Sequence, residues 1–165
     1  HDWLQDGAPD ACVFLRSSPD CTPALRGLHA AFIEVAIRKQ LEDIDGPEDR
    51  LWLMLDDFPS LARIPSLLRG VTQGRAHGLV TVVTGQSYEQ LGRAYNDEDA
   101  RSLLCNLQHR VAFRIADPGC AKRCVEWLGD AVTATELMHL APWTAMVSRT
   151  GDYPVCRIDV PLRAH

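Results

Sequence analysis

The chain has 165 residues, 46% of them apolar and 24% charged, with a net charge of −5. A chain of this length and composition is expected to fold as one globular domain over residues 1–165. The mild acidity excludes a uniformly basic surface for nucleic acid, and no apolar run approaches the length of a membrane span. Any membrane anchor is therefore expected outside the chain.

The first fifty residues predict a short strand, a long helix and a turn. The apolar run at 11–15 is typical of a buried strand. Thr22 and Pro23 supply a cap and a first-turn proline for a helix over 24–41. Because this helix is apolar around nearly its whole circumference, we expect it to be covered on two sides. Asp45-Gly46-Pro47 then predicts a turn.

The next segment joins an apolar strand to a pair of acids. Leu51-Trp52-Leu53-Met54-Leu55 predicts a strand buried on both faces of a parallel sheet, and Asp56, Asp57 and Pro59 follow it. The two carboxylates are expected at the carboxyl edge of the sheet, where open α/β folds bind ligands. This is the pattern of a Walker B strand, in which one acid holds Mg²⁺ and the other positions an attacking water. Helix caps and phosphoacceptor pockets can show the same sequence.

The middle of the chain predicts a second helix and a second strand. Residues 60–77 are helical in pattern, are interrupted by Pro65 and end at Gly78, a suitable helix terminator. Residues 79–84 are rich in β-branched side chains and predict another buried strand, followed by Gly85-Gln86-Ser87.

The rest of the chain continues the alternation of helices and strands. The expected elements are a helix over 88–94, a helix over 100–107 capped by residues 96–99, a strand over 110–115, a helix over 117–128 ended by Gly129, and a hairpin of 144–149 with 153–160. This order predicts a three-layer α/β domain with a mostly parallel sheet and a C-terminal β-hairpin at its edge.

The cysteines do not form a metal-binding pattern. Six are present, none in a CxxC pair. Cys120 and Cys124 would share one helix face, but no histidine lies near them in the sequence, so zinc is not expected. We expect reduced and mostly buried thiols.

Four residues are candidates for chemistry at a nucleotide. Asp56 and Asp57 could be a metal ligand and a water-positioning acid, or a solvated strand end with a capping acid. Gln86 ends the second strand, where its amide could contact a terminal phosphate and a water, or simply be a polar strand end. Arg75 lies between glycines that allow close backbone approach, and it could stabilise phosphoryl-transfer charge or be an ordinary surface arginine.

The combination resembles a known family, the type IV coupling proteins of conjugation, which are TraD/TraG-like hexameric ATPases. The residues that carry the resemblance are Leu55-Asp56-Asp57-Phe58-Pro59-Ser60-Leu61, Ile64-Pro65-Ser66-Leu67, Gln73-Gly74-Arg75, Gly78, Gly85-Gln86-Ser87, Gln90-Leu91, Tyr95, Asn106-Leu107, Val111-Ala112-Phe113-Arg114, Asp117-Pro118 and Leu128-Gly129. His1-Asp2-Trp3-Leu4 also resembles a segment of this family, so the likeness covers almost the whole chain.

The resemblance implies a RecA-like P-loop NTPase fold that binds ATP and Mg²⁺. It makes Asp56 the Mg²⁺ ligand, Asp57 the water-positioning acid in place of the usual glutamate, Gln86 the γ-phosphate sensor and Arg75 a finger that acts on a neighbouring subunit. It also implies a hexamer, DNA, relaxase and secretion-channel partners, and a cytoplasmic domain of a protein anchored in the bacterial inner membrane.

One part of a complete ATPase is missing from the sequence. No G-x-x-x-x-G-K-[ST] motif is present, and neither Lys39 nor Lys122 follows a glycine. We expect the chain to correspond to the C-terminal portion of the motor domain, with poor ATP affinity of its own. Without the central Walker A strand, we expect it to rearrange, to pair through the open edge with a second copy, or to be the remnant of a longer protein.

Two other interpretations use the same residues. The chain could be a catalytically inactive RecA-like module that acts by protein–protein interaction through the face of Arg75. A receiver-like domain using the Asp56/Asp57 pair would need a lysine at a later strand end, and Ile115-Ala116-Asp117 offers none.

Overall fold

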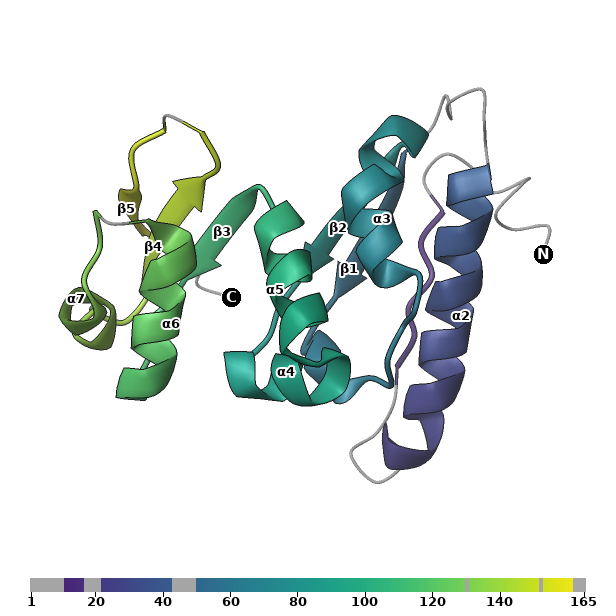
Figure 1. Cartoon of the computed structure of the whole chain (residues 1–165), viewed down its shortest axis with the longest axis horizontal. Coiled ribbons are helices and arrows are strands. Elements are labelled where there is room, and N and C mark those ends of the chain that lie inside the picture. Colours follow the sequence, from purple (N-terminus) through teal and green to yellow (C-terminus); the bar gives the residue numbers. More distant parts are fainter. Residues whose placement is uncertain (1–10, 17–21, 43–49, 130, 152, 162–165) are drawn as a thin grey trace. The chain divides into compact units, whose positions relative to one another are not determined.

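Figure 1 shows the computed structural model, which describes residues 11–16, 22–42, 50–129, 131–151 and 153–161. The expected turn at Asp45-Gly46-Pro47 and the segment His1-Asp2-Trp3-Leu4 lie outside the described residues. The chain divides into two compact units, 1–86 with 90–100 and 87–89 with 101–165. That the two units form a single domain stays a prediction.

The first unit carries the expected long helix and both apolar strands. In chain order the elements up to residue 106 are α2 (Thr22–Glu42), β1 (Leu51–Leu55), the 3-10 helix η1 (Phe58–Ser60), α3 (Leu67–Gln73), the 3-10 helix η2 (Gly74–His77), β2 (Leu79–Val83), α4 (Tyr88–Tyr95) and α5 (Asp97–Asn106). Gly78, with φ +69°, ends η2 in the left-handed conformation expected of a terminating glycine. Among the described residues, no helix is both long and apolar enough to cross a bilayer.

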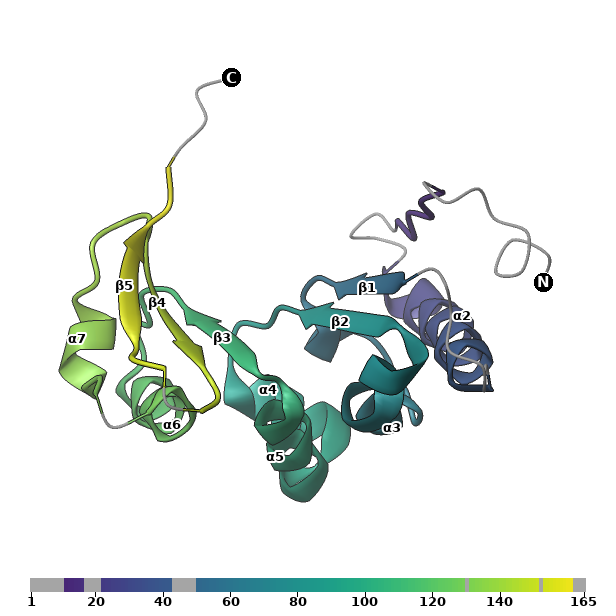
Figure 2. The same cartoon turned by 90° about the horizontal axis from the view of Figure 1, so that it is seen from above.

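β1 and β2 are parallel and in register. Leu51 pairs with Leu79 at one end and Leu55 pairs with Val83 at the other. In Figure 2, α3 lies on one side of this pair, and α2 lies next to α3. The contact is close because Gly70 lacks a Cβ atom, which would lie only 3.2 Å from the Ile37 side chain of α2.

Three expectations about burial in this unit are wrong. β1 is buried on one face, because Trp52 and Met54 on the other face are 56% and 70% exposed. The run at 11–15 forms no strand, and its side chains are exposed. α2 is covered on one side only within the described residues, where Leu28, Phe32 and Val35 remain exposed. In each case the side chains are apolar, as the sequence pattern indicates, but no described element covers them.

The second unit is built on an antiparallel sheet. Its elements are β3 (His109–Ala112), α6 (Pro118–Leu128), α7 (Ala134–Met138), β4 (Thr144–Arg149) and β5 (Cys156–Asp159), with the strands in the order β3-β4-β5. The predicted hairpin is confirmed, but it pairs with β3 and not with β1 or β2. β3 is also shorter than the predicted strand at 110–115. The core of this unit lies between the sheet and the helices α6 and α7.

Helix α7 was not predicted, although its sequence contains a cap. The Thr133 hydroxyl accepts from the Glu136 amide, and the Glu136 carboxylate accepts from the Thr133 amide, which is a capping box. The cysteines are only partly as expected. Cys120 and Cys124 are buried, and burial, followed by the neighbouring Cys120, raises the pKa of Cys124 to about 12, whereas three further described cysteines are exposed.

Candidate functional site

The two acids and the end of β2 are joined by one threonine. The Thr84 hydroxyl donates to Oδ1 of Asp56 at 2.5 Å and accepts from the amide of Asp57 at 2.8 Å. The Thr84 backbone extends the strand pairing on both sides, since its amide donates to the Leu55 carbonyl at 2.9 Å and its carbonyl accepts from the Phe58 amide at 3.0 Å. The acids therefore lie at the carboxyl edge of the sheet, as the sequence predicted.

Asp57 occupies an unusual backbone conformation. Its φ of 46° and ψ of 43° are left-handed, which few non-glycine residues adopt. Asp57 connects β1 to η1. Its Oδ1 atom is buried. Within the part of the chain that the structure describes, this oxygen has no hydrogen-bond partner. A buried acceptor without a donor calls for a bound water or ligand.

Gln86 lies at the same edge as the acids. It follows Thr84 by two residues and is exposed. Gly85, between them, lies against the proline that follows the acids: a Cβ atom on Gly85 would be 3.2 Å from Cγ of Pro59. This close approach holds the segment after β2 beside the segment after β1, so the structure brings Asp56, Asp57 and Gln86 to one edge.

Arg75 lies at the opposite edge. It belongs to η2, and the neighbouring Gly74 is packed so closely on Leu79 that a Cβ atom would be 2.9 Å from the Leu79 Cβ. Leu79 is the first residue of β2, so the whole strand separates Arg75 from the acids, roughly 16 Å at 3.3 Å per residue. An arginine side chain cannot span that length. The structure therefore does not bring Arg75 to the acids of its own chain.

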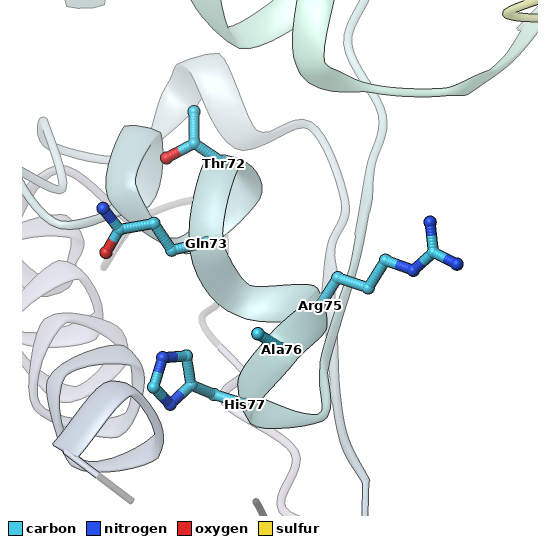
Figure 3. A pocket seen from close by; sticks show the side chains of 5 residues that line it. All are labelled: Thr72, Gln73, Arg75, Ala76 and His77. Carbon is cyan, nitrogen blue, oxygen red and sulfur yellow. The ribbon is translucent and has the colours of Figure 1, made fainter. Parts of the chain in front are cut away.

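An open hollow of about 560 Å³ surrounds the Arg75 end of the sheet. It is lined by Thr72, Gln73, Arg75, Ala76 and His77. Figure 3 shows Arg75 extending to the opposite side of the helix from Gln73 and His77. The hollow contains none of the residues at the acid edge. The hydrogen-bonded acids are the stronger candidate site, because an open surface hollow holds few converging polar groups.

The acid edge suits Mg²⁺ better than a metal that needs an all-protein cage. Among the described residues, no cluster of three or more His, Cys, Asp or Glu side chains could hold a metal ion. Mg²⁺ usually takes one or two carboxylates and obtains its other ligands from phosphates and water. Asp56 is exposed, and only its Oδ1 atom is engaged by Thr84. The residues present therefore fit a metal that arrives with a nucleotide.

The roles of two residues at this site were not predicted from the sequence. Thr84 was predicted only as the last residue of a strand, although a hydroxyl at a strand end beside two acids is a usable signal. Tyr95 is one of the residues that carry the family resemblance, but its contact with Phe58 was not predicted, because that contact joins elements far apart in the sequence. The four predicted residues divide into three at one edge and Arg75 at the other.

The chain is similar to known conjugation proteins. A sequence model of the family described as "Type IV secretion-system coupling protein DNA-binding domain" matches residues 1–132. The coupling protein TraD of Escherichia coli (strain K12) is 28% identical over an alignment of 116 residues, and the match covers 68% of this chain and 16% of TraD.

Solved structures of a coupling protein are similar over almost the whole chain. The unbound monoclinic form of the bacterial conjugative coupling protein TrwBdeltaN70 matches with a TM-score of 0.88 and 26% identity, and it covers 99% of this chain. The plasmid coupling protein TrwB in complex with ADP and Mg²⁺ matches with a TM-score of 0.87 and 27% identity. This chain spans 43% of each of these structures.

These matches confirm the predicted fold class, the RecA-like P-loop NTPase fold, and the predicted family. The family model covers well over half of the chain. The chain belongs to the type IV secretion-system coupling proteins.

Proposed function

We propose that the chain forms the acid and sensor part of the nucleotide site in a hexameric coupling ATPase that drives DNA and protein transfer in bacterial conjugation. One observation carries the proposal: the in-register pairing of β1 with β2, extended by Thr84, places Asp56, Asp57 and Gln86 at one sheet edge. The TrwB structures with ADP and Mg²⁺ and with a non-hydrolysable ATP analogue support a nucleotide as the ligand.

Each residue at the edge has a role that its position permits. Asp56 would hold Mg²⁺ through the oxygen that Thr84 leaves free. The ion would neutralise charge on the phosphates of ATP. Asp57 would accept a proton from the attacking water and orient it, a role that its partnerless Oδ1 supports. The Gln86 amide would donate to a terminal phosphate oxygen while its carbonyl accepts from the same water.

Arg75 would act on the nucleotide of a neighbouring subunit. Its side chain is exposed and lies a strand length away from the acids of its own chain. An exposed guanidinium at a subunit boundary could stabilise the charge that develops during phosphoryl transfer, as arginine fingers do. The proposed hexamer therefore completes each site with an arginine from the next chain.

DNA and the membrane enter the proposal through the family alone. The matching family model is described as a DNA-binding domain, although the chain has a net charge of −5 and no concentrated basic run. We propose DNA, relaxase and secretion-channel proteins as partners, and a cytoplasmic position in a protein anchored in the inner membrane.

ATP hydrolysis by the full-length gene product that carries this sequence tests the proposal. Asp57→Asn should lower kcat by about 100-fold or more, within the range for loss of a general base, and should leave ATP binding nearly intact. Glu98→Gln, an exposed acid at the start of α5, is the control and should hydrolyse ATP at the wild-type rate. Wild-type hydrolysis by Asp57→Asn would contradict the assignment.

An inactive module is the second candidate, because the sequence contains no phosphate-binding loop. Such a module would act by protein–protein interaction through the Arg75 face. An ATPase assay of residues 1–165 by themselves can exclude this second candidate. If they hydrolyse ATP at a rate that Asp57→Asn abolishes, the inactive module is ruled out.

A further inference from the structure

Thr84 makes four hydrogen bonds to the segment that carries the acids. Its backbone amide and carbonyl contact Leu55 and Phe58, and its hydroxyl contacts Asp56 and Asp57. These bonds involve four consecutive residues, from the last residue of β1 to the first of η1.

The hydroxyl can serve both acids only in one orientation. It has a single proton, and the amide of Asp57 must use its own proton to reach the hydroxyl oxygen. The Thr84 proton is therefore committed to Oδ1 of Asp56, and a hydrogen bond to an ionised carboxylate is of the stronger, charge-assisted kind. This bond fixes the rotation of the carboxylate, and it leaves Oδ2 as the oxygen with full capacity to bind a cation.

The same hydroxyl holds the turn at Asp57. A non-glycine residue in the left-handed region needs support from its surroundings. The Asp57 amide donates to Thr84 Oγ1 at 2.8 Å, and the next amide donates to the Thr84 carbonyl. Loss of the hydroxyl would remove one of the two bonds that fix the turn, so the direction of both carboxylates depends on this side chain.

We propose that Thr84 is a positioning residue that orients Asp56 for Mg²⁺ and Asp57 for water. This inference rests on the proposed function, since it names what aligns the acids of that site. Hydrogen-bond partners of metal ligands typically change metal affinity 10- to 100-fold when they are removed. Thr84 acts through Asp56 and Asp57 and does not itself contact the nucleotide.

The test compares three variants of the full-length gene product. Thr84→Val keeps the shape and removes the hydroxyl, and Thr84→Ser keeps the hydroxyl. Thr81→Val is the matched control, because Thr81 lies on β2, three residues before Thr84, and its buried Oγ1 has no hydrogen-bond partner in the described structure. The readouts are the Mg²⁺ concentration for half-maximal ATP hydrolysis and the ATP affinity in EDTA.

Thr84→Val should raise the half-maximal Mg²⁺ concentration by about 10-fold or more, while ATP affinity in EDTA stays at the wild-type value. Thr84→Ser and Thr81→Val should both stay close to the wild type. A general folding defect would instead lower ATP affinity with and without Mg²⁺. In an Asp56→Asn background, Thr84→Val should produce no further loss of Mg²⁺-dependent ATP binding, because the group it orients is already gone.

Two failures can be told apart. If the wild type hydrolyses ATP in a Mg²⁺-dependent manner and Thr84→Val behaves like Thr81→Val, the positioning role is overturned and the proposed function stands. If the wild-type protein shows no Mg²⁺-dependent hydrolysis, the proposed function fails, and the role of Thr84 fails with it.

Discussion

The rings of Phe58 and Tyr95 lie with their centroids 5.8 Å apart at an interplanar angle of 51°, and both residues are buried. The Tyr95 hydroxyl accepts a hydrogen bond from the amide of Ile64 at 3.1 Å. Because Phe58 directly follows Asp57, the last residue of α4 supports the turn that carries the acids. Tilted aromatic pairs of this kind add to the stability that burial provides.

Replacement of Tyr95 by phenylalanine should destabilise the protein without disturbing the ring pair. The Ile64 amide would lose its acceptor, and Ile64 is only 1% exposed, so water cannot easily replace the hydroxyl. A buried donor without a partner costs about 1–3 kcal/mol. We expect the free energy of unfolding in denaturant titrations to fall by about that amount.

Tyr153→Phe is the control for this loss. Tyr153 is 55% exposed, and its ring, which Arg149 covers at 4.4 Å, would be preserved by phenylalanine. The free energy of unfolding should change by less than about 0.5 kcal/mol. Equal effects of the two substitutions would show that the Ile64 bond does not contribute.

Alanine substitutions at two glycines should change the stability of the protein in opposite directions. Both have helical surroundings, where alanine is intrinsically favoured by about 1 kcal/mol. A Cβ atom at Gly74 would lie 2.9 Å from the Leu79 Cβ, an atom that cannot swing away, whereas one at Gly27 in α2 meets nothing within 4 Å. We expect Gly74→Ala to lose about 1–3 kcal/mol from overpacking.

Gly27→Ala should gain about 0.5–1 kcal/mol. Thermal unfolding of the two variants beside the wild type measures both changes. Stabilisation by Gly74→Ala would mean that η2 does not pack on the start of β2 as described, and it would weaken the placement of Arg75 at that edge.

The sequence could predict the acid edge because the chemistry is local there. Five apolar residues run directly into Asp56 and Asp57, and a second β-branched run ends just before Gln86, so the strand ends and their parallel pairing follow from patterns within each segment. The opposite placement of Arg75 follows as well, since it precedes the second strand.

Burial could not be predicted in the same way. The residues of β1 alternate between buried and exposed faces, although Trp52 and Met54 are as apolar as their neighbours. An apolar run shows which side chains could be buried. It does not show whether another element of the fold covers them. The role of Thr84 was missed for a related reason, because its two acid partners lie across a strand pair.

Glu34 should make stability depend on pH. Burial by itself would raise the pKa of Glu34, but hydrogen bonds from the amide and hydroxyl of Ser66 and from Arg38 outweigh it, so the pKa lies below its ordinary value. A lowered folded-state pKa gives stability that is present above the unfolded-state pKa and is lost as the pH falls through the folded-state pKa.

The stability advantage of the wild type over Glu34→Gln should therefore shrink as the pH falls from about 7 to about 3. Chemical denaturation at several pH values measures this difference. Glu126→Gln, at an exposed position of α6, is the control for replacing a glutamate by glutamine. An advantage for the wild type that stays constant down to the lowest pH would contradict the role of the Ser66 and Arg38 bonds.

Mixing two defective variants tests whether Arg75 acts on a neighbouring subunit. Arg75→Ala and Asp57→Asn should each lower ATP hydrolysis in the full-length gene product, with ATP binding nearly intact. If the arginine acts in trans, mixed rings contain sites in which an intact Asp57 faces an intact Arg75 from the next chain. In an equimolar random ring these are about a quarter of all sites, so mixing should restore about a quarter of the wild-type rate.

Asp57→Asn mixed with Gln86→Ala is the matched control for this experiment. Asp57 and Gln86 lie at the same edge of one chain, so every site in a mixed ring carries one defect or the other, and no activity should return. Arg75 lies a strand length from that edge, and only its defect can be compensated by a neighbour. Recovery in the control mixture would mean that the acids and the glutamine are shared between chains. No recovery with Arg75→Ala, in rings shown to exchange subunits, would mean that Arg75 serves no neighbouring site.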